Sequence, residues 1–182
     1  MKKVALIVGH NEVSKGAFSP YLKSYEFDYW KEIAMGIKSK TGIDVFTRGY
    51  NKSYTNEMKQ VLNKVHASGK YDLVIELHFN SVDDYNVNGA EILVYKNSKC
   101  VHVANVILNN MCKEFDLKNR GLKKISSVAE RGGFGIMRCK YPYILIEPFF
   151  GSNVDDSEKF KNKEKVVNFL SNFIKTCEVY YD

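Results

Sequence analysis

Residues 73–78, LVIELH, form a short apolar run that ends in a histidine, His78. A second run, VALIV at residues 4–8, is followed by Gly9 and His10. Apolar runs of this length predict strands that are buried on both faces, as in a parallel sheet. The carboxyl ends of such strands open onto one crevice, so we expect the two histidines to converge there. Because neutral imidazole is the commonest metal ligand, the pair indicates a metal site.

Strand and helix patterns alternate along the rest of the chain, which is typical of parallel strands joined by helices. Residues 116–140 contain four glycines and show no regular pattern, so we expect them to be irregular. We predict an α/β fold with a single domain at 1–177 and a C-terminal tail at 178–182. Its twisted, mostly parallel sheet has about six strands, flanked by helices on both faces. The predicted strands are 3–8, 43–47, 72–78, 90–95 and 143–147, and the predicted helices are 25–40, 53–67, 98–115 and 156–177.

The composition is that of a globular protein with a basic surface. The chain has 182 residues, of which 45% are hydrophobic and 26% charged, and its net charge is +6. This charge favours an anionic partner such as nucleic acid, a membrane surface or an acidic wall polymer. The basic residues are scattered, however, and the sequence has no RNA-binding motif, zinc finger or nucleotide-binding loop. We therefore expect no nucleic-acid partner.

The N-terminus and the cysteines indicate the compartment. Only five apolar residues follow Lys3, too few for a signal peptide, and no run approaches the roughly 18 apolar residues of a membrane span. We therefore expect a protein made in the cytoplasm, with no export signal and no membrane insertion. Its cysteines lie far apart and form no CxxC pair, which is typical of free thiols in a reducing compartment. They are Cys100, Cys112, Cys139 and Cys177.

A carboxylate follows a third apolar run. Residues 143–146 lead directly into Glu147, which precedes Pro148. Burying a carboxylate without a partner is unfavourable, so a structural ion pair is the ordinary explanation for one such residue. If this strand is parallel to the other two, Glu147 emerges at the same edge as His10 and His78. Coincidence at three strand ends favours a functional role for Glu147.

Four acidic residues are candidates for a third metal ligand: Glu12, Glu26, Asp28 and Glu76. Glu12 lies too close to His10 in the chain. Glu76 shares a strand face with His78 and is placed to orient an imidazole. Glu26 lies in the first turn of the helix after the first strand, and such helices begin at the carboxyl edge of the sheet. We therefore choose Glu26.

Two histidines and one carboxylate leave one tetrahedral position for water, the pattern of a catalytic zinc site. Zinc lowers the pKa of its water to about 7. Glu147 would take the proton and pass it to a leaving nitrogen. The other histidines, His66 and His102, fall within predicted helices, and we interpret them as surface or packing residues.

Several motifs together resemble those of zinc-dependent N-acetylmuramoyl-L-alanine amidases, in particular the catalytic domains of phage endolysins. The resemblance covers almost the whole chain, and it depends on the order and spacing of the motifs. The matching segments are VGH at 8–10, YEF at 25–27, ELHFNS at 76–81, GAEILVY at 89–95, NRGLK at 119–123 and LIEPFFGSN at 145–153. Two features depart from the family pattern: residues 7–8 are Ile-Val instead of Asp-Pro, and residues 130–135 form a glycine-rich insertion.

The resemblance implies hydrolysis of the amide between the lactyl group of N-acetylmuramic acid and the L-alanine of the stem peptide. Bacterial peptidoglycan is then the partner and Zn2+ the cofactor. His10, Glu26 and His78 would hold the zinc, and Glu147 would be the catalytic residue. Residues expected to support a ligand or contact substrate are Glu76, Asn80 and Arg131.

Two alternatives remain open. A zinc carboxypeptidase or endopeptidase acting within the stem peptide would use the same ligands, and a non-catalytic wall-binding module could share the fold. A glycosidase would instead need paired carboxylates without a metal. The resemblance to endolysins further implies synthesis in a host cytoplasm and action on the wall after release. Endolysins usually carry a separate wall-binding domain, so we expect either an excised catalytic domain or a single-domain lytic enzyme.

Overall fold

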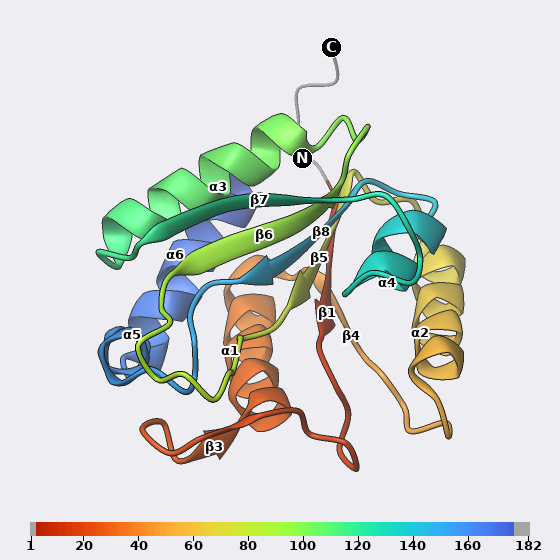
Figure 1. Cartoon of the computed structure of the whole chain (residues 1–182). Coiled ribbons are helices and arrows are strands. Elements are labelled where there is room, and N and C mark those ends of the chain that lie inside the picture. Colours follow the sequence, from red (N-terminus) through yellow and green to blue (C-terminus); the bar gives the residue numbers. More distant parts are fainter. Residues whose placement is uncertain (1–2, 177–182) are drawn as a thin grey trace.

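A six-stranded sheet runs through the centre of the computed structural model, which describes residues 3–176 (Figure 1). Its strands are β1 (Val4–Val8), β4 (Asp44–Thr47), β5 (Leu73–Leu77), β6 (Ala90–Tyr95), β7 (Asn119–Ile125) and β8 (Tyr143–Glu147). They lie in the order β4-β1-β5-β8-β6-β7. All neighbours are parallel except β8 and β6, which are antiparallel. The predicted α/β fold with a mostly parallel sheet of six strands is confirmed.

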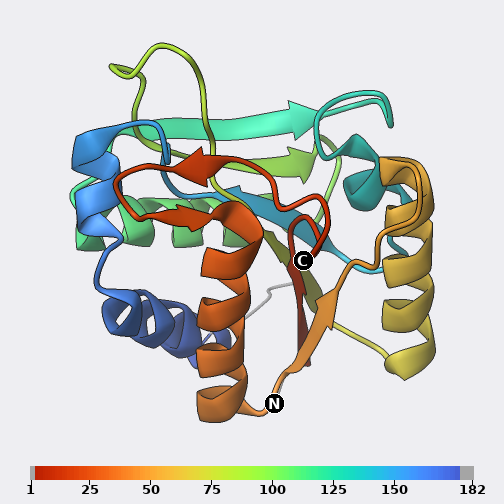
Figure 2. The ribbon, with the colours of Figure 1, turned by 90° about the horizontal axis from the view of Figure 1, so that it is seen from below.

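Helices cover both faces of this sheet, as predicted. They are α1 (Glu26–Thr41), α2 (Tyr54–Ser68), α3 (Val101–Glu114), α4 (Gly133–Arg138), α5 (Val154–Lys159) and α6 (Lys163–Thr176). One core lies between the sheet and the layer of α1, α3 and α6, and a smaller core lies under α2 and α4. Figures 1 and 2 show the sheet between these two layers.

Strands β1, β5 and β8 end level with one another. Each is a continuous apolar run apart from Glu76 and Glu147, and each is buried along its whole length. Backbone hydrogen bonds continue just past the strands: Gly9 N donates to Leu77 O, and His78 N donates to Ile146 O, both at 3.0 Å. This register brings the residues that follow β1 and β5 to the same edge as the last residue of β8.

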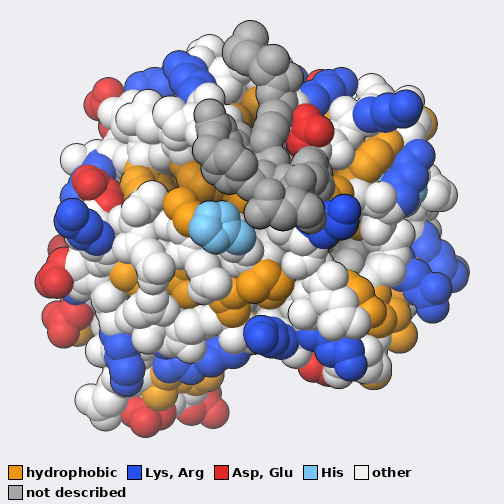
Figure 3. Space-filling model, turned by 90° about the horizontal axis from the view of Figure 1, so that it is seen from above, with side chains coloured by type: hydrophobic (Ala, Val, Ile, Leu, Met, Phe, Trp, Pro, Cys, Tyr) orange, Lys and Arg blue, Asp and Glu red, His pale blue; other side chains and the backbone are white. Residues whose placement is uncertain are grey.

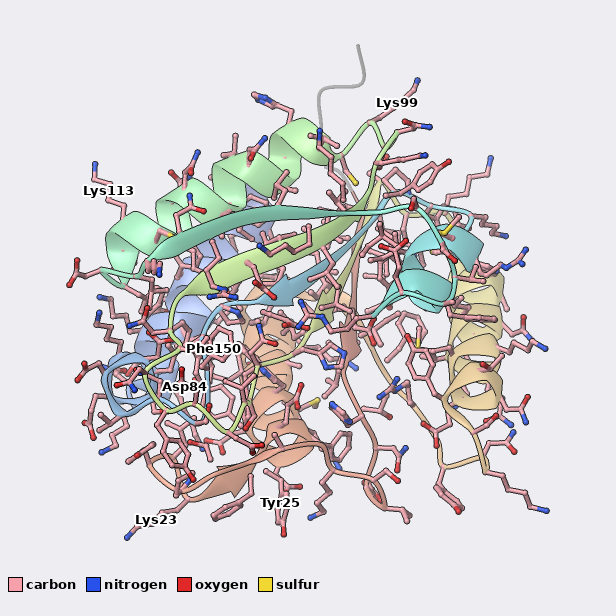
Figure 4. The ribbon with its side chains drawn as sticks, in the orientation of Figure 1. Lys23, Tyr25, Asp84, Lys99, Lys113 and Phe150 are labelled. Atoms are coloured by element: carbon pink, nitrogen blue, oxygen red, sulfur yellow. The ribbon has the colours of Figure 1, made fainter. Side chains whose placement is uncertain are left out.

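A small antiparallel hairpin leads into α1 and was not predicted. It comprises β2 (Phe18–Ser19) and β3 (Ser24–Tyr25). Lys23 and Tyr25 point from it into solvent (Figure 4), whereas the next residue, Glu26, is buried. The Glu26 amide donates to Ala17 O at 2.9 Å, which ties the start of α1 to the hairpin.

The prediction that residues 116–140 are irregular was wrong. They contain β7, which pairs with β6 at the edge of the sheet, and the short helix α4. The sequence of β7, NRGLKKI, has few apolar residues because an edge strand contacts only one neighbour and remains partly exposed. α4 contains two glycines and only six residues, too few for a visible helical period.

The prediction of a single closing helix at 156–177 was also wrong, because the chain forms two helices in this region. α5 starts earlier, where Asn153 caps it by accepting a 2.9 Å hydrogen bond from the Asp156 amide. The chain then breaks at Phe160, which is buried and stacks on Phe149 with ring centroids 4.2 Å apart. Tyr29 Oη donates to the Phe160 carbonyl at 2.8 Å, satisfying a group that no longer takes part in a helix. The last predicted residue of this helix, Cys177, lies outside the described residues.

Three cysteines within residues 3–176 are free thiols, as expected: Cys100, Cys112 and Cys139. The predicted tail at 178–182 lies outside the described part of the chain. On the face in Figure 3, Lys and Arg side chains are spread among uncharged and acidic ones. Across residues 3–176, no helix combines the length and the apolar character that crossing a bilayer requires.

Candidate metal centre and groove

His10 is held at the carboxyl edge of the sheet immediately after β1. Its backbone is in the left-handed region, with φ of 63°, a conformation that few residues other than glycine adopt. The Nε2 atom lies 3.0 Å from Glu26 Oε2. A Cβ on Gly9 would lie 2.4 Å from a carbon of the His78 ring, so a glycine is required for the two imidazoles to approach.

Glu26 is the first residue of α1, and its carboxylate is almost fully buried between the two histidines. Besides His10, its Oε1 atom lies 2.7 Å from His78 Nδ1 and accepts the Phe79 amide at 3.0 Å. Gly16, with φ of 78°, passes close beside it, since an added Cβ would lie 2.6 Å from Glu26 Oε2. The loop between β1 and the hairpin therefore packs its backbone directly against the carboxylate.

The second ring nitrogen of His78 contacts Glu76, two residues earlier on the same face of β5. Glu76 Oε1 lies 3.1 Å from His78 Nε2, and Glu76 Oε2 accepts a 2.6 Å hydrogen bond from Tyr143 Oη. Glu76 is completely buried. This chain of contacts fixes the plane of the imidazole and directs Nδ1 toward Glu26 and His10.

His10, Glu26 and His78 together can hold a metal ion. Each offers one ligand atom, and these atoms lie within 4.8 Å of one another. Two imidazole nitrogens and a carboxylate oxygen, with one histidine supported by a second carboxylate, fit the donor preferences of zinc. The structure thus brings together the three residues chosen from the sequence and places Glu76 beside them.

The other candidates for the third ligand make different contacts. Glu12 pairs with Lys31 at 2.7 Å, and Asp28 pairs with Lys15 at 2.9 Å. Glu76 contacts the nitrogen of His78 that faces away from Glu26. His66, in the last turn of α2, accepts the Lys140 amide at 3.2 Å.

The carboxylates of the cluster are held ionised. Burial would raise the pKa of Glu26, but hydrogen bonds with His10 and His78 lower it to about 2. Burial is likewise opposed at Glu76 by the charge and hydrogen bond of His78, and its pKa is also about 2. In turn, the Glu76 charge and the Glu26 hydrogen bond outweigh burial at His78 and raise its pKa to about 10. Binding of a metal at His78 would oppose this shift, because a metal ligand must be a neutral imidazole.

Glu147 ends β8 in a different environment. It is 5% exposed, and burial raises its pKa to about 7, against the opposing charges of Arg131 and His78. Arg131 Nη1 lies 3.0 Å from Glu147 Oε2, but without hydrogen-bond geometry, so this buried oxygen has no hydrogen-bond partner among the described residues. Glu147 is thus the one carboxylate of the site that is poised to exchange a proton near neutral pH.

A network around Glu91 supports Arg131. Because β6 is antiparallel to β8, Glu91 lies directly opposite Glu147. Arg131 contacts Glu91 through Nη2 and donates from Nη1 to Asn80 Oδ1 at 2.7 Å. Asn80 Nδ2 donates to Glu91 at 3.1 Å, and Arg120 Nε donates to it at 2.8 Å. These contacts lower the pKa of Glu91 against the effect of burial. The sequence identifies Arg131 and Asn80 as candidates but not Glu91, although a charged residue within the apolar strand 90–95 is a signal that could have identified it.

One groove of about 910 Å³ at the carboxyl edge of the sheet is lined by His10, Glu26, His78, Asn80, Arg131 and Glu147. Its walls are the start of α2, the loop at 128–132 and the segment that carries His10. A second hollow of similar volume, between α3 and α6, contains none of the residues considered above.

Comparison with known proteins identifies the family. The family model for N-acetylmuramoyl-L-alanine amidases (Amidase_3) matches residues 4–176, so the chain belongs to this family of peptidoglycan hydrolases. A search of curated protein sequences gave no significant match.

Solved structures share the fold. Cwp6 from Clostridium difficile is 25% identical with a TM-score of 0.76, and the match covers 96% of this chain but only 29% of Cwp6. The catalytic domain of the CD27L endolysin, which targets Clostridia difficile, is 24% identical with a TM-score of 0.73, covering 99% of this chain and 100% of that one. The catalytic domain of the amidase CwlV from Bacillus (Paenibacillus) polymyxa is 21% identical with a TM-score of 0.70, covering 96% and 99%.

We expect Glu76→Gln to weaken zinc binding by about 10- to 100-fold, because the carboxylate that orients His78 and supports its basicity is lost. Competition with a chromophoric chelator measures the affinity. Glu12→Gln and Asp28→Asn are matched controls that remove nearby carboxylates paired with lysines, and their affinity should equal that of the wild type. Unchanged affinity in Glu76→Gln would contradict the supporting role of Glu76, and an equal loss in either control would show that the effect is not specific to the contact with His78.

Proposed function

We propose that this chain is a zinc-dependent N-acetylmuramoyl-L-alanine amidase, which hydrolyses the amide between the lactyl group of N-acetylmuramic acid and the L-alanine of the stem peptide. The observation that carries the proposal is that the metal-ligating group and Glu147 open onto one groove. Membership of the amidase family supports this choice of bond.

His10, Glu26 and His78 would hold the zinc. As a Lewis acid, zinc would activate water as a nucleophile near neutral pH and polarise the scissile carbonyl. Glu26 supplies a ligand that stays ionised, since its pKa is about 2. Glu76 contacts His78 Nε2, which leaves Nδ1 as the nitrogen that would bind the metal. The imidazole would therefore need no reorientation to bind the ion.

Glu147 is the proposed general base and acid. Its pKa of about 7 allows the carboxylate to accept a proton from the attacking water and then to give it to the leaving nitrogen of L-alanine. Arg131 and Asn80 line the same groove. We propose that they contact the substrate and stabilise the wall of the groove that carries Glu147. Arg131 also opposes the rise of the Glu147 pKa through its charge.

We further propose that the chain acts as the catalytic unit of a lytic enzyme of the phage endolysin type. The likeness of its fold to the catalytic domain of the CD27L endolysin supports this setting. Attachment to the wall would then depend on another domain, on the net charge of +6, or on both.

The bond that is cut can be identified from the products. Purified peptidoglycan treated with the zinc-loaded protein should release stem peptides with a free L-alanine amino group, together with intact muramic acid. Mass spectrometry of the fragments, with and without a chelator, makes this measurement. Cleavage within the stem peptide would support the peptidase alternative, and release that continues undiminished in chelator would contradict the zinc mechanism.

We expect Glu147→Gln to keep its zinc but to lose at least roughly 10²-fold in turnover, because the amide cannot accept or deliver the proton. Zinc content by elemental analysis and the rate of amide hydrolysis are measured on the same preparation. Loss of zinc together with activity would make Glu147 a ligand and contradict its role in proton transfer.

We expect Arg131→Gln to shift the acidic limb of the pH profile of kcat/KM to higher pH. The guanidinium lowers the pKa of Glu147, so its removal raises that pKa, and Glu147 then becomes ionised only at higher pH. Arg138→Gln, which removes an exposed arginine of α4 outside the groove, is the control and should leave the profile unchanged. A profile of Arg131→Gln that matches the wild type would exclude this coupling.

A further inference from the structure

Arg48 is a buried cation in the groove to which the proposed mechanism gives no role. It directly follows β4 and so lies at the same carboxyl edge of the sheet as His10 and His78. It is 5% exposed, and of the lysines and arginines in residues 3–176 it alone is buried. Within those residues, no aspartate or glutamate lies within ion-pairing distance of it, whereas Arg120 and Arg131 both pair with Glu91.

The contacts of Arg48 do not neutralise its charge. Its Nε donates to the His10 carbonyl at 3.3 Å, and its Nη1 lies 3.4 Å from the Met58 sulfur. Its Cζ is 5.3 Å from the centre of the Tyr54 ring. All three partners are neutral, and arginine remains protonated even when it is buried. The charge of Arg48 helps to lower the pKa of the buried Glu76, but Glu76 contacts His78 and Tyr143 and not the guanidinium. No carboxylate contacts this buried charge directly, so the guanidinium is available to an anion that enters the groove.

The surroundings favour an anion on the groove side. Arg48 lines the groove together with residues 52–55, which include the start of the 15-residue helix α2, and the positive end of that helix points into this region. Glu57 also lines this wall, but it accepts the Asn51 amide at 3.3 Å and does not pair with Arg48. The planar guanidinium fork matches the geometry of a carboxylate.

We propose that Arg48 binds a free carboxylate of the stem peptide. This inference rests on the proposed amidase function, because it assumes that peptidoglycan enters the groove. The lactyl carboxyl of the substrate is the acyl part of the scissile amide, so the glycan side offers only hydroxyl and acetamido groups. The stem peptide is the part that carries free carboxylates. Arg48 therefore marks the peptide side of the groove and selects an acidic stem.

Three synthetic substrates test this assignment. All are muramoyl tripeptides of the form L-alanyl-γ-D-glutamyl-L-lysine. In the first, both the α-carboxylate of the second residue and the C-terminus are amidated. The second has the free α-carboxylate alone, and the third has the free C-terminal carboxylate alone.

For the wild-type enzyme loaded with zinc, kcat/KM should be roughly 10- to 100-fold higher for one of the charged substrates than for the neutral one, as expected for a charge-assisted hydrogen bond. Arg48→Gln should reduce this ratio to about one, and Arg48→Lys, which keeps the charge but loses the fork, should give an intermediate ratio. Arg138→Gln should keep the wild-type ratio.

Zinc content is measured for each variant, because Arg48 also holds the His10 carbonyl. A wild-type ratio near one for both charged substrates would overturn the proposal, and this comparison does not depend on any variant folding. A ratio that survives in folded Arg48→Gln would overturn it as well. Equal losses of rate on all three substrates, with reduced zinc, would show that Arg48 only supports His10.

The experiment gives a different result if the proposed amidase function, rather than the anion site at Arg48, is wrong. If the wild type cleaves none of the three substrates, calorimetry of the corresponding free tripeptides with wild type and Arg48→Gln still decides the role of Arg48. Tighter binding of a charged peptide that requires Arg48 would support the anion site while refuting the amidase activity. Equal binding of charged and neutral peptides would overturn the anion site.

Discussion

The buried carboxylate of Glu26 is the constraint on which the site depends. It lies at the start of α1 with both oxygens inside the protein, so its charge must be matched by donors from elsewhere in the chain. The donors with the shortest contacts are His10 after β1, His78 after β5 and the Phe79 amide, and the Ala17 amide adds a longer hydrogen bond. Three segments distant in sequence are thereby tied together at one edge of the sheet. The two imidazole nitrogens that contact the carboxylate are also, together with a carboxylate oxygen, the atoms able to bind a metal.

A second constraint arises from the reversal of β6. The antiparallel pairing with β8 places Glu91 opposite Glu147, and two buried carboxylates at such a position repel each other. Arg120 on β7 and Arg131 on the following loop compensate these charges. The polar sequence of β7 therefore has a function, because this edge strand must supply cations to the start of β6. That same polarity is what concealed the strand from sequence analysis.

The parts of the fold that could be predicted are those in which burial produces a recognisable pattern of apolar residues in the sequence. Strands β1, β5 and β8 are apolar along their length, and the polar residues at their ends located His10, His78 and Glu147 correctly at one edge. The break at Phe160 was not predictable, because it depends on stacking against an aromatic residue distant in sequence. Arg48 was equally hidden, since an arginine after a strand is usually exposed and only the structure shows that this one is buried with no carboxylate in direct contact.

Glu26, Glu76 and Glu147 differ in what surrounds them, and this difference divides their roles. Glu26 and Glu76 each contact an imidazole, and both have a pKa of about 2 despite their burial. Glu147 receives no comparable hydrogen bond, so burial dominates and its pKa is about 7. Carboxylates whose environments separate their pKa values in this way can act as ligand or support on one side and as proton carrier on the other. The division follows from position alone: the strand that carries Glu76 also supplies His78, whereas the end of β8 has no histidine, and its carboxylate faces the groove.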